Sequence, residues 1–280
     1  MKRRILGISR STKFSPHSED RDAAIFMAVA SRLNRGSNDV TIISEDLFIA
    51  VDLSDFDLVF SMARGRSVLE ALAEAEEKNG LIVVNSPKSL LRMSRGTIVN
   101  LFIKNALPMP TAQVVSPTEL ERTTVAYPFW IKRADACAQN SGDVCLISND
   151  EEKQKAISRF NEQGTPSIVV EQHVSGDLVK FYGVEGTDFF SVAYPTGEGG
   201  FSKFGLEAAN GLPQHFPFSQ EEMKRTADRA AQLTGMTVYG GDAIVGEDGQ
   251  FKIIDFNDWP SFSSCRRDAA KAIASRINKM

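Results

Sequence analysis

One stretch near the C-terminus, YGGDAIVGEDGQFKIIDFNDWPSF, most strongly constrains how this 280-residue chain can fold. It contains two short apolar runs, Gly240–Gly246 and Phe251–Asn257, which we predict to be β-strands. The Asp248-Gly249 pair between them is a strong short-range signal for a hairpin turn. The chain is therefore expected to place two antiparallel strands side by side at this point.

The register of this hairpin decides which polar side chains meet. With a two-residue turn, Glu247 pairs with Gln250, and counting back places Asp242 opposite Asp255. Paired side chains lie on one face roughly 5 Å apart, and Asn257 lies on that face because strand side chains alternate with a period of two. Like charges directly opposite each other destabilise a sheet, so the pattern favours a bound cation, and all-oxygen ligands suit Mg²⁺ or Mn²⁺.

The alternative is that these three polar residues lie on a solvated face without a ligand. Apolar neighbours favour a largely buried strand, and hence the metal site: Ile253, Ile254, Phe256 and Trp259.

Length and composition are those of a globular protein with two or three packed lobes, since 42% of the residues are hydrophobic and 24% are charged. A net charge of −4 gives no general attraction to nucleic acid or to acidic membranes. No apolar run approaches the roughly 20 residues of a membrane span, and the N-terminus does not read as a signal peptide. Three cysteines without metal-ligand spacing argue against a disulfide framework, and we expect a cytoplasmic protein.

Residues 4–85 alternate short apolar strands with amphipathic helices. We expect four strands and two helices, at residues 4–8, 39–43, 58–62 and 81–85 and at residues 22–33 and 68–78. This alternation predicts a parallel, doubly wound α/β sheet, whose carboxyl edge is where ligands bind. The loop 9–20 and the Arg64-Gly65-Arg66 turn lie at that edge, and each is either a ligand contact or a solvated surface feature. No G-x-G-x-x-G motif follows the first strand, which disfavours a dinucleotide site.

The hairpin residues resemble the metal-binding end of the ATP-grasp enzymes. Asp242, Asp255-Phe256-Asn257 and Pro260 match the D/E-x-N-x-x-P pattern of that superfamily. It includes D-alanine–D-alanine ligase, glutathione synthetase, RimK-type ligases and an inositol-phosphate kinase branch.

The resemblance covers about residues 80–277 and implies a domain organisation. It implies an α+β ATP-grasp domain at residues 86–280, preceded by the α/β lobe at residues 1–85. Within the ATP-grasp domain, a lid subdomain is expected at about residues 112–174 and a metal and substrate subdomain at about residues 175–280.

The resemblance also implies four basic residues at the phosphates and the reaction centre. Arg95 matches a phosphate-binding position that usually holds lysine. Lys132, which ends the apolar run 127–132, matches the lysine that contacts the α- and β-phosphates. Lys180 is expected to face the phosphates or the transferring phosphoryl group, and Lys203 the reaction centre. Arg95 as an ordinary exposed helix residue is the alternative at that position.

The nucleoside contacts that the resemblance implies follow a predicted strand at residues 167–171. Glu171, Gln172, His173 and Val174 match the hinge whose backbone binds adenine, and Asp177 matches a ribose contact. A partly buried histidine without a ligand role is the preferred alternative for the His173 side chain.

The implied activity is an ATP- and Mg²⁺-dependent ligase. A carboxylate would form an acyl phosphate that an amine or a thiol captures, releasing ADP and phosphate. A small-molecule kinase and a non-catalytic ATP-binding regulatory module are the alternatives, the latter because Arg95 replaces lysine and the loop 134–143 holds a single glycine. The expected partners are ATP and small-molecule carboxylates and amines, and a homodimer remains open.

Overall fold

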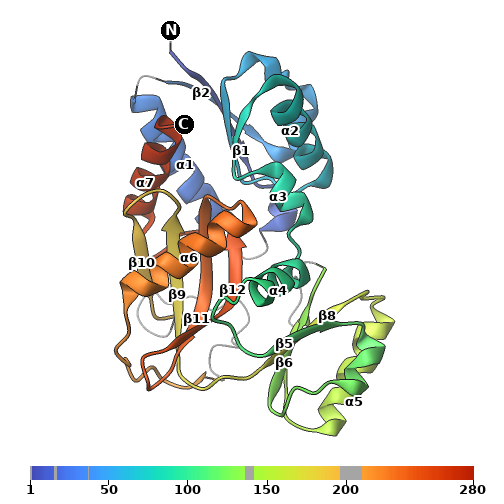
Figure 1. The fold of residues 1–280 in the computed structure, drawn as a ribbon. Coiled ribbons are helices and arrows are strands. Elements are labelled where there is room, and N and C mark those ends of the chain that lie inside the picture. The colour runs from blue at the N-terminus through green and yellow to red at the C-terminus, as the bar shows by residue number, and fades with distance from the viewer. Residues whose placement is uncertain (1, 16–17, 37, 136–141, 196–209) are drawn as a thin grey trace.

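The computed structural model describes residues 2–15, 18–36, 38–135, 142–195 and 210–280. Its strands form three four-stranded sheets, which we call the N-terminal, central and lid sheets. Figure 1 shows the N-terminal sheet at the top, the central sheet below it and the lid sheet at the lower right.

The N-terminal sheet is parallel throughout, with strand order β2-β1-β3-β4, which confirms the predicted doubly wound α/β arrangement. Its strands are β1 (Arg4–Ser9), β2 (Asp39–Ser44), β3 (Leu58–Ser61) and β4 (Ile82–Val84). Its helices are α1 (Glu19–Arg35) and α2 (Arg66–Asn79), with short 3₁₀ turns η1 (Thr12–Phe14), η2 (Glu45–Ala50) and η3 (Leu53–Asp55). β3 is buried along its whole length, as expected for a parallel strand covered on both faces.

The core of this lobe includes the end of the chain. Helix α7 (Arg266–Asn278) lies alongside α1 (Figure 1) and contributes buried Ile273 and Ile277 to the same apolar cluster as Phe26 and Phe60. The division into residues 1–85 and 86–280 stays a prediction, but this packing core crosses it.

The central sheet is antiparallel, with strand order β10-β9-β11-β12. Its elements are β9 (Asp177–Val184), β10 (Phe190–Ala193), β11 (Val238–Val245), β12 (Phe251–Asp258) and the covering helix α6 (Gln220–Thr234). The Ser219 side chain caps α6, and Gly235 ends the helix in the left-handed region. One face of this sheet packs on α6 and on α4 (Arg95–Lys104), which follows the short helix α3 (Pro87–Arg92).

The lid sheet is also antiparallel, with strand order β5-β8-β6-β7. Its elements are β5 (Ala112–Val115), β6 (Phe129–Arg133), β7 (Val144–Ile147), β8 (Ile168–Gln172), α5 (Asp150–Glu162) and η4 (Pro117–Arg122). Helix α5 covers one face, where Phe129 and Phe160 are buried. The sequence analysis missed β5 and β10, which are four-residue strands without a fully buried residue.

The predicted two-residue turn in the β11–β12 hairpin is wrong. The Gly246 N–H donates to the Gln250 carbonyl at 2.8 Å, so three residues form the loop. Gly249 has φ +77°, the left-handed conformation that ends a three-residue hairpin loop. The pairing near the turn is therefore shifted by one residue from the expected one, with Val245 opposite Phe251.

A β-bulge then restores the predicted pairing further along. Ala243 pairs with Ile253 but Asp242 pairs with Asp255, which leaves Ile254 as an extra residue in β12. Because of this extra residue, Ile253 and Phe256 both face the core cluster under α6. Without it, the period of two would turn Asp255 toward the same core as Ile253.

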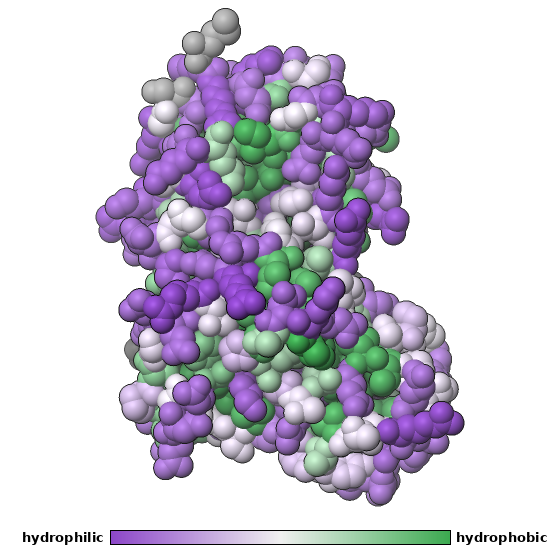
Figure 2. All heavy atoms as spheres, in the orientation of Figure 1, coloured by the Kyte–Doolittle hydropathy of each residue, from purple (hydrophilic) through white to green (hydrophobic). Residues whose placement is uncertain are grey.

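Figure 2 shows hydrophilic side chains over most of one face of the molecule, with apolar side chains gathered over the N-terminal lobe at the top and over α4 and the lid sheet further down. In the part of the chain that the structure describes, no helix has the length and apolar character needed to cross a membrane.

The shared core predicts that a change in α7 destabilises the N-terminal lobe. Ile273 is fully buried, so Ile273→Ala is expected to lower the free energy of unfolding by about 2–5 kcal/mol. Urea denaturation would measure this loss, with Ile49→Ala as the control because Ile49 is 99% exposed. A loss for Ile273→Ala no larger than that of the control would contradict the shared core.

Candidate functional site

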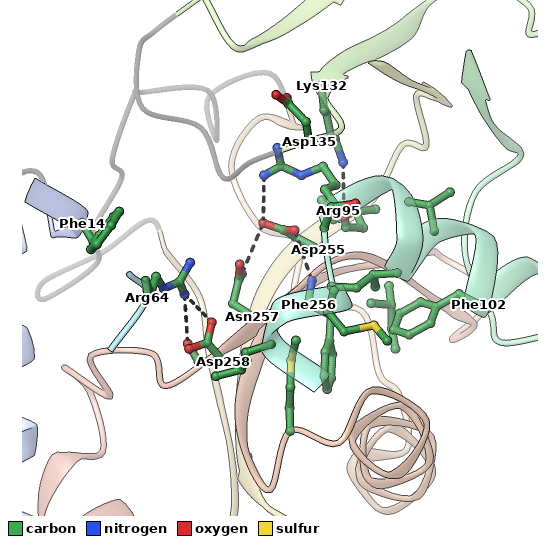
Figure 3. Close-up of a pocket in the computed structure, with 18 of the residues that line it drawn as sticks. Phe14, Arg64, Arg95, Phe102, Lys132, Asp135, Asp255, Phe256, Asn257 and Asp258 are labelled. Atoms are coloured by element: carbon green, nitrogen blue, oxygen red, sulfur yellow. Dashed lines mark hydrogen bonds and ion pairs between the residues drawn. The ribbon is translucent and has the colours of Figure 1, made fainter. Parts of the chain in front are cut away.

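The three predicted metal ligands lie together on one face of the central sheet. Asp242 on β11 is opposite Asp255 on β12, and the Asn257 side-chain N–H₂ donates to Asp255 Oδ2 at 3.3 Å (Figure 3). The Asp242 and Asp255 side chains are 28% and 27% exposed, so a ligand can reach both. Two carboxylates and an amide oxygen fit a Mg²⁺ or Mn²⁺ ion that also binds phosphate oxygens.

Each of these carboxylates lies against a predicted phosphate-binding cation. Lys180 Nζ is 3.1 Å from Asp242 Oδ1, and β9 and β11 hold the two residues directly opposite each other. Arg95 begins α4, and its Nη2 is 3.7 Å from Asp255 Oδ2. The Arg95 guanidinium also donates to the Arg133 carbonyl at 2.9 Å, which joins α4 to the lid sheet.

The charge state of Asp255 follows from this setting. Burial alone would raise its pKa, but the Arg95 and Lys132 cations, together with hydrogen bonds from Asn257 and the backbone, hold it below its usual value. Asp255 is therefore ionised at neutral pH and available as an anionic ligand.

Lys132 and Glu171 form a buried ion pair inside the lid sheet. Lys132 Nζ is 2.6 Å from Glu171 Oε1, and their side chains are only 9% and 3% exposed. Lys132 also donates to the Ile254 carbonyl at 2.8 Å, so it reaches from the lid sheet to the bulged residue of the central sheet. Burial raises the pKa of Glu171, and the Lys132 ammonium opposes this shift.

The predicted hinge, Glu171, Gln172, His173 and Val174, runs through the end of β8. The Gln172 and His173 N–H groups already donate to the carbonyls of Thr111 and Pro128. The Val174 N–H has no acceptor among the described residues, which leaves one hinge amide for a ligand. The His173 side chain accepts a hydrogen bond from Trp130 Nε1 at 3.1 Å, and burial lowers its pKa.

The Asp177 side chain is engaged in a contact outside this group. The buried Asp177 carboxylate accepts the backbone N–H groups of Gln214 at 2.6 Å and Phe216 at 2.8 Å, so it anchors the segment before α6. Its ribose contact stays a prediction. Lys203 lies outside the described residues.

The three candidate metal ligands, Asp242, Asp255 and Asn257, are called the metal patch below, and two pockets meet there at Asn257. The first, which we call the lid-side pocket, has a volume of about 280 Å³ and contains Arg95, Lys132, Glu171 and Asp255 among apolar residues of α4 and β12. The second, the N-lobe-side pocket, is of similar volume. It is lined by charged and hydroxyl side chains that include Arg10, Asp22, Lys180, Asp242 and Tyr182. Four residues line both pockets: Phe14, Arg64, Asn257 and Asp258.

The loops of the N-terminal lobe contribute a buried charge network to the second pocket. Arg10, which is 8% exposed, pairs with Asp22 at 2.8 Å and donates to the carbonyls of Met62 and Trp259. Arg64 pairs with Asp258, the residue after Asn257 (Figure 3). Arg66, by contrast, has a side chain that is 83% exposed, so the two arginines of the predicted turn have different environments.

The sequence analysis missed Arg10 and Asp258. Arg10 follows the first strand at the edge where ligands were expected, which is the signal that could have drawn attention to it. Its partner Trp259 is 249 residues away, and no local pattern encodes that contact.

No protein-family model matches the sequence, and no curated protein sequence matches it either. Solved structures do match over almost the whole chain. D-alanine–D-alanine ligase from Bacillus anthracis, complexed with ATP, has a TM-score of 0.68 at 12% identity over 99% of both chains. A RimK domain ATP-grasp protein from Sphaerobacter thermophilus has a TM-score of 0.68 at 16% identity over 98% of both chains. VanG D-Ala:D-Ser ligase from Enterococcus faecalis has a TM-score of 0.66 at 16% identity, over 98% of this chain and 95% of that one.

These neighbours align with this chain over 95% or more of each chain. The chain therefore has the ATP-grasp fold, as the sequence resemblance predicted.

The buried pair predicts a pH-dependent effect of removing Lys132. Lys132→Met leaves Glu171 buried without its counter-ion, which is expected to cost about 3–5 kcal/mol of unfolding free energy at pH 7. The cost is fully present when the pH is above the raised folded-state pKa of Glu171. It is lost as the pH falls from there toward the pKa that Glu171 has in the unfolded chain, because the buried carboxyl group then becomes neutral.

Urea denaturation of wild type and variant at pH 7 and pH 5 would measure the difference. The double variant Lys132→Met/Glu171→Gln serves as the control and is expected to recover most of the stability at pH 7. Equal stability of the single and double variants at pH 7 would contradict the structural role of the pair.

Proposed function

We propose, from the ATP-grasp fold and the arrangement of its site residues, that this chain is an ATP-dependent ligase that joins a carboxylate to an amine or a thiol. The observation that carries the proposal is that the two pockets share Asn257, with Asp255 lining the lid-side pocket and Asp242 the N-lobe-side pocket. A reaction that transfers a phosphoryl group from one pocket to an acceptor in the other needs a shared charged boundary of this kind.

ATP would occupy the lid-side pocket. Its apolar wall, formed by side chains such as Ile98, Phe102 and Ile254, suits the planar base. The cations of Arg95, Lys132 and Lys180 would lie along the phosphates. Val174 of the predicted hinge lines a separate pocket with Gly246 and Lys252, so its contact with the base stays a prediction. A bound Mg²⁺ ion, held by Asp242, Asp255 and Asn257, would neutralise charge on the β- and γ-phosphates.

The acceptor carboxylate would enter from the N-lobe-side pocket. One of its oxygens attacks the γ-phosphorus, the bond from that phosphorus to the bridging oxygen breaks, and ADP leaves with the bonding electrons. The amine or thiol then attacks the acyl carbon, loses its proton, and expels phosphate as the acyl–oxygen bond breaks. Lys180 lines this pocket beside Asp242, where it can stabilise the developing negative charge.

The numbers of positive and negative side chains in the N-lobe-side pocket favour the ligase over the kinase. Among the described residues that line the N-lobe-side pocket, three cations, Arg10, Arg64 and Lys180, face three carboxylates, Asp22, Asp242 and Asp258. A polyphosphorylated acceptor would need an excess of positive charge, whereas a small carboxylate or zwitterion suits a balanced set.

Turnover assays test the proposal directly. The purified protein with Mg-ATP and pooled carboxylates, amines and thiols is expected to release ADP and phosphate in equal amounts. Release should require a carboxylate together with an amine or thiol. Asp255→Asn is expected to lower the rate at least about 100-fold, because it removes an anionic ligand of the transferring group.

The matched control is Asp39→Asn, which makes the same change at an exposed position of the edge strand β2 and should leave the rate unchanged. ADP formed without free phosphate, together with a phosphorylated acceptor, would replace the ligase with a kinase. Tight ATP binding without turnover across the whole pool would favour the regulatory module.

A further inference from the structure

The geometry points to an exchange of ionic partners at the metal patch. We propose that Lys180 and Arg95 serve as counter-ions for Asp242 and Asp255 before nucleotide binds, and that the nucleotide phosphates draw these cations away so that a divalent ion can take their place. The inference rests on the proposed nucleotide site, but it concerns the order and coupling of binding rather than the reaction.

The first pair is fixed by the central sheet itself. β9 and β11 place Lys180 directly opposite Asp242, and the 3.1 Å contact joins side chains that are 21% and 28% exposed. Solvent therefore screens this pair only partly, and the ammonium group covers an oxygen that a metal ion would use.

The second pair is looser. Arg95 Nη2 lies 3.7 Å from Asp255 Oδ2, and the same guanidinium is held by the Arg133 carbonyl. Figure 3 shows the Arg95 side chain pointing from α4 toward Asp255, on the side opposite Asn257. Because the Arg95 guanidinium is also hydrogen-bonded to the lid sheet, it is less able than Lys180 to move toward the phosphates. We therefore expect the move of Lys180 from Asp242 to the phosphates to have the larger effect on metal binding.

The protein ligands alone are too few for tight metal binding. In the described ranges, no group of three or more His, Cys, Asp and Glu side chains is placed to hold a metal ion. Mg²⁺ is commonly bound by one or two carboxylates together with substrate phosphates. The phosphates would therefore have two effects, because they supply missing ligands and also give Lys180 a new anionic partner.

Metal and nucleotide should consequently bind with strong positive coupling, and the coupling must be reciprocal. Lys180 is predicted to have opposite effects on the two ligands. It opposes the metal when nucleotide is absent and favours the nucleotide when it binds. A residue with a purely structural role would weaken both.

Mn²⁺ binding followed by electron paramagnetic resonance tests this prediction without turnover. Mn²⁺ would be titrated into wild type and Lys180→Met, each with and without a non-hydrolysable ATP analogue. Affinity for the analogue would be measured separately by calorimetry. Lys271→Met, at an exposed position of α7, is the control because it makes the same change in net charge away from the site.

Lys180→Met is expected to tighten Mn²⁺ binding at least about fivefold without nucleotide, because it removes the positive charge beside Asp242. The same variant should bind the analogue at least about tenfold more weakly, and Lys271→Met should change neither value. Lys180→Gln provides a second variant with a neutral polar side chain, and thermal denaturation would confirm that both are folded.

Unchanged or weaker Mn²⁺ binding by both folded Lys180 variants without nucleotide would overturn the partner exchange. In that case, wild-type binding of the analogue would leave the proposed function standing. If wild type does not bind the analogue at all, the proposed function fails instead, which the calorimetry separates from the first outcome.

Discussion

The extra residue at Ile254 is the constraint on which the site depends. β12 must bury Phe251, Ile253 and Phe256 against the core under α6, and it must also present Asp255 on the opposite face. A regular strand cannot do both, because its side chains alternate with a period of two. The bulge changes the phase of the alternation between Ile253 and Phe256. It also leaves the Ile254 carbonyl available to Lys132, so the lid sheet is joined to the central sheet at the point where the phase changes.

The charges around β12 come from all three sheets or their flanking segments. Lys132 approaches from the lid sheet, Lys180 from the neighbouring central strand, and Arg64 from the loop after β3. Each cation already has an anionic partner, so the groups are held in place before any ligand arrives. Such preorganisation is what electrostatic stabilisation of a developing charge requires. It brings a cost in stability, because partly buried ion pairs seldom recover their full desolvation penalty.

Local patterns in the sequence predicted the parallel sheet of the N-terminal lobe, the strands of the β11–β12 hairpin and the resemblance to the fold. The pairing of Asp242 with Asp255 was predicted correctly, but only because two errors cancel. The hairpin loop contains one residue more than expected, and the bulge at Ile254 adds one unexpected residue to β12. No short-range signal marks a bulge between apolar residues such as Ile253 and Ile254. The Arg10 contacts and the packing of α7 on α1 join opposite ends of the chain, so periodicity within a segment could not reveal them.

The segment after β12 joins the candidate site to the core of the N-terminal lobe. Trp259 and Phe262 have φ values of +37° and +49°, a region that bulky residues rarely adopt. Both side chains are fully buried in the cluster formed by α1, β3 and α7, and Arg10 binds the Trp259 carbonyl. Burial of two large aromatic rings offsets a conformational cost of a few kcal/mol. The end of β12, which carries Asn257 and Asp258 into the N-lobe-side pocket, is therefore anchored in the core of the N-terminal lobe.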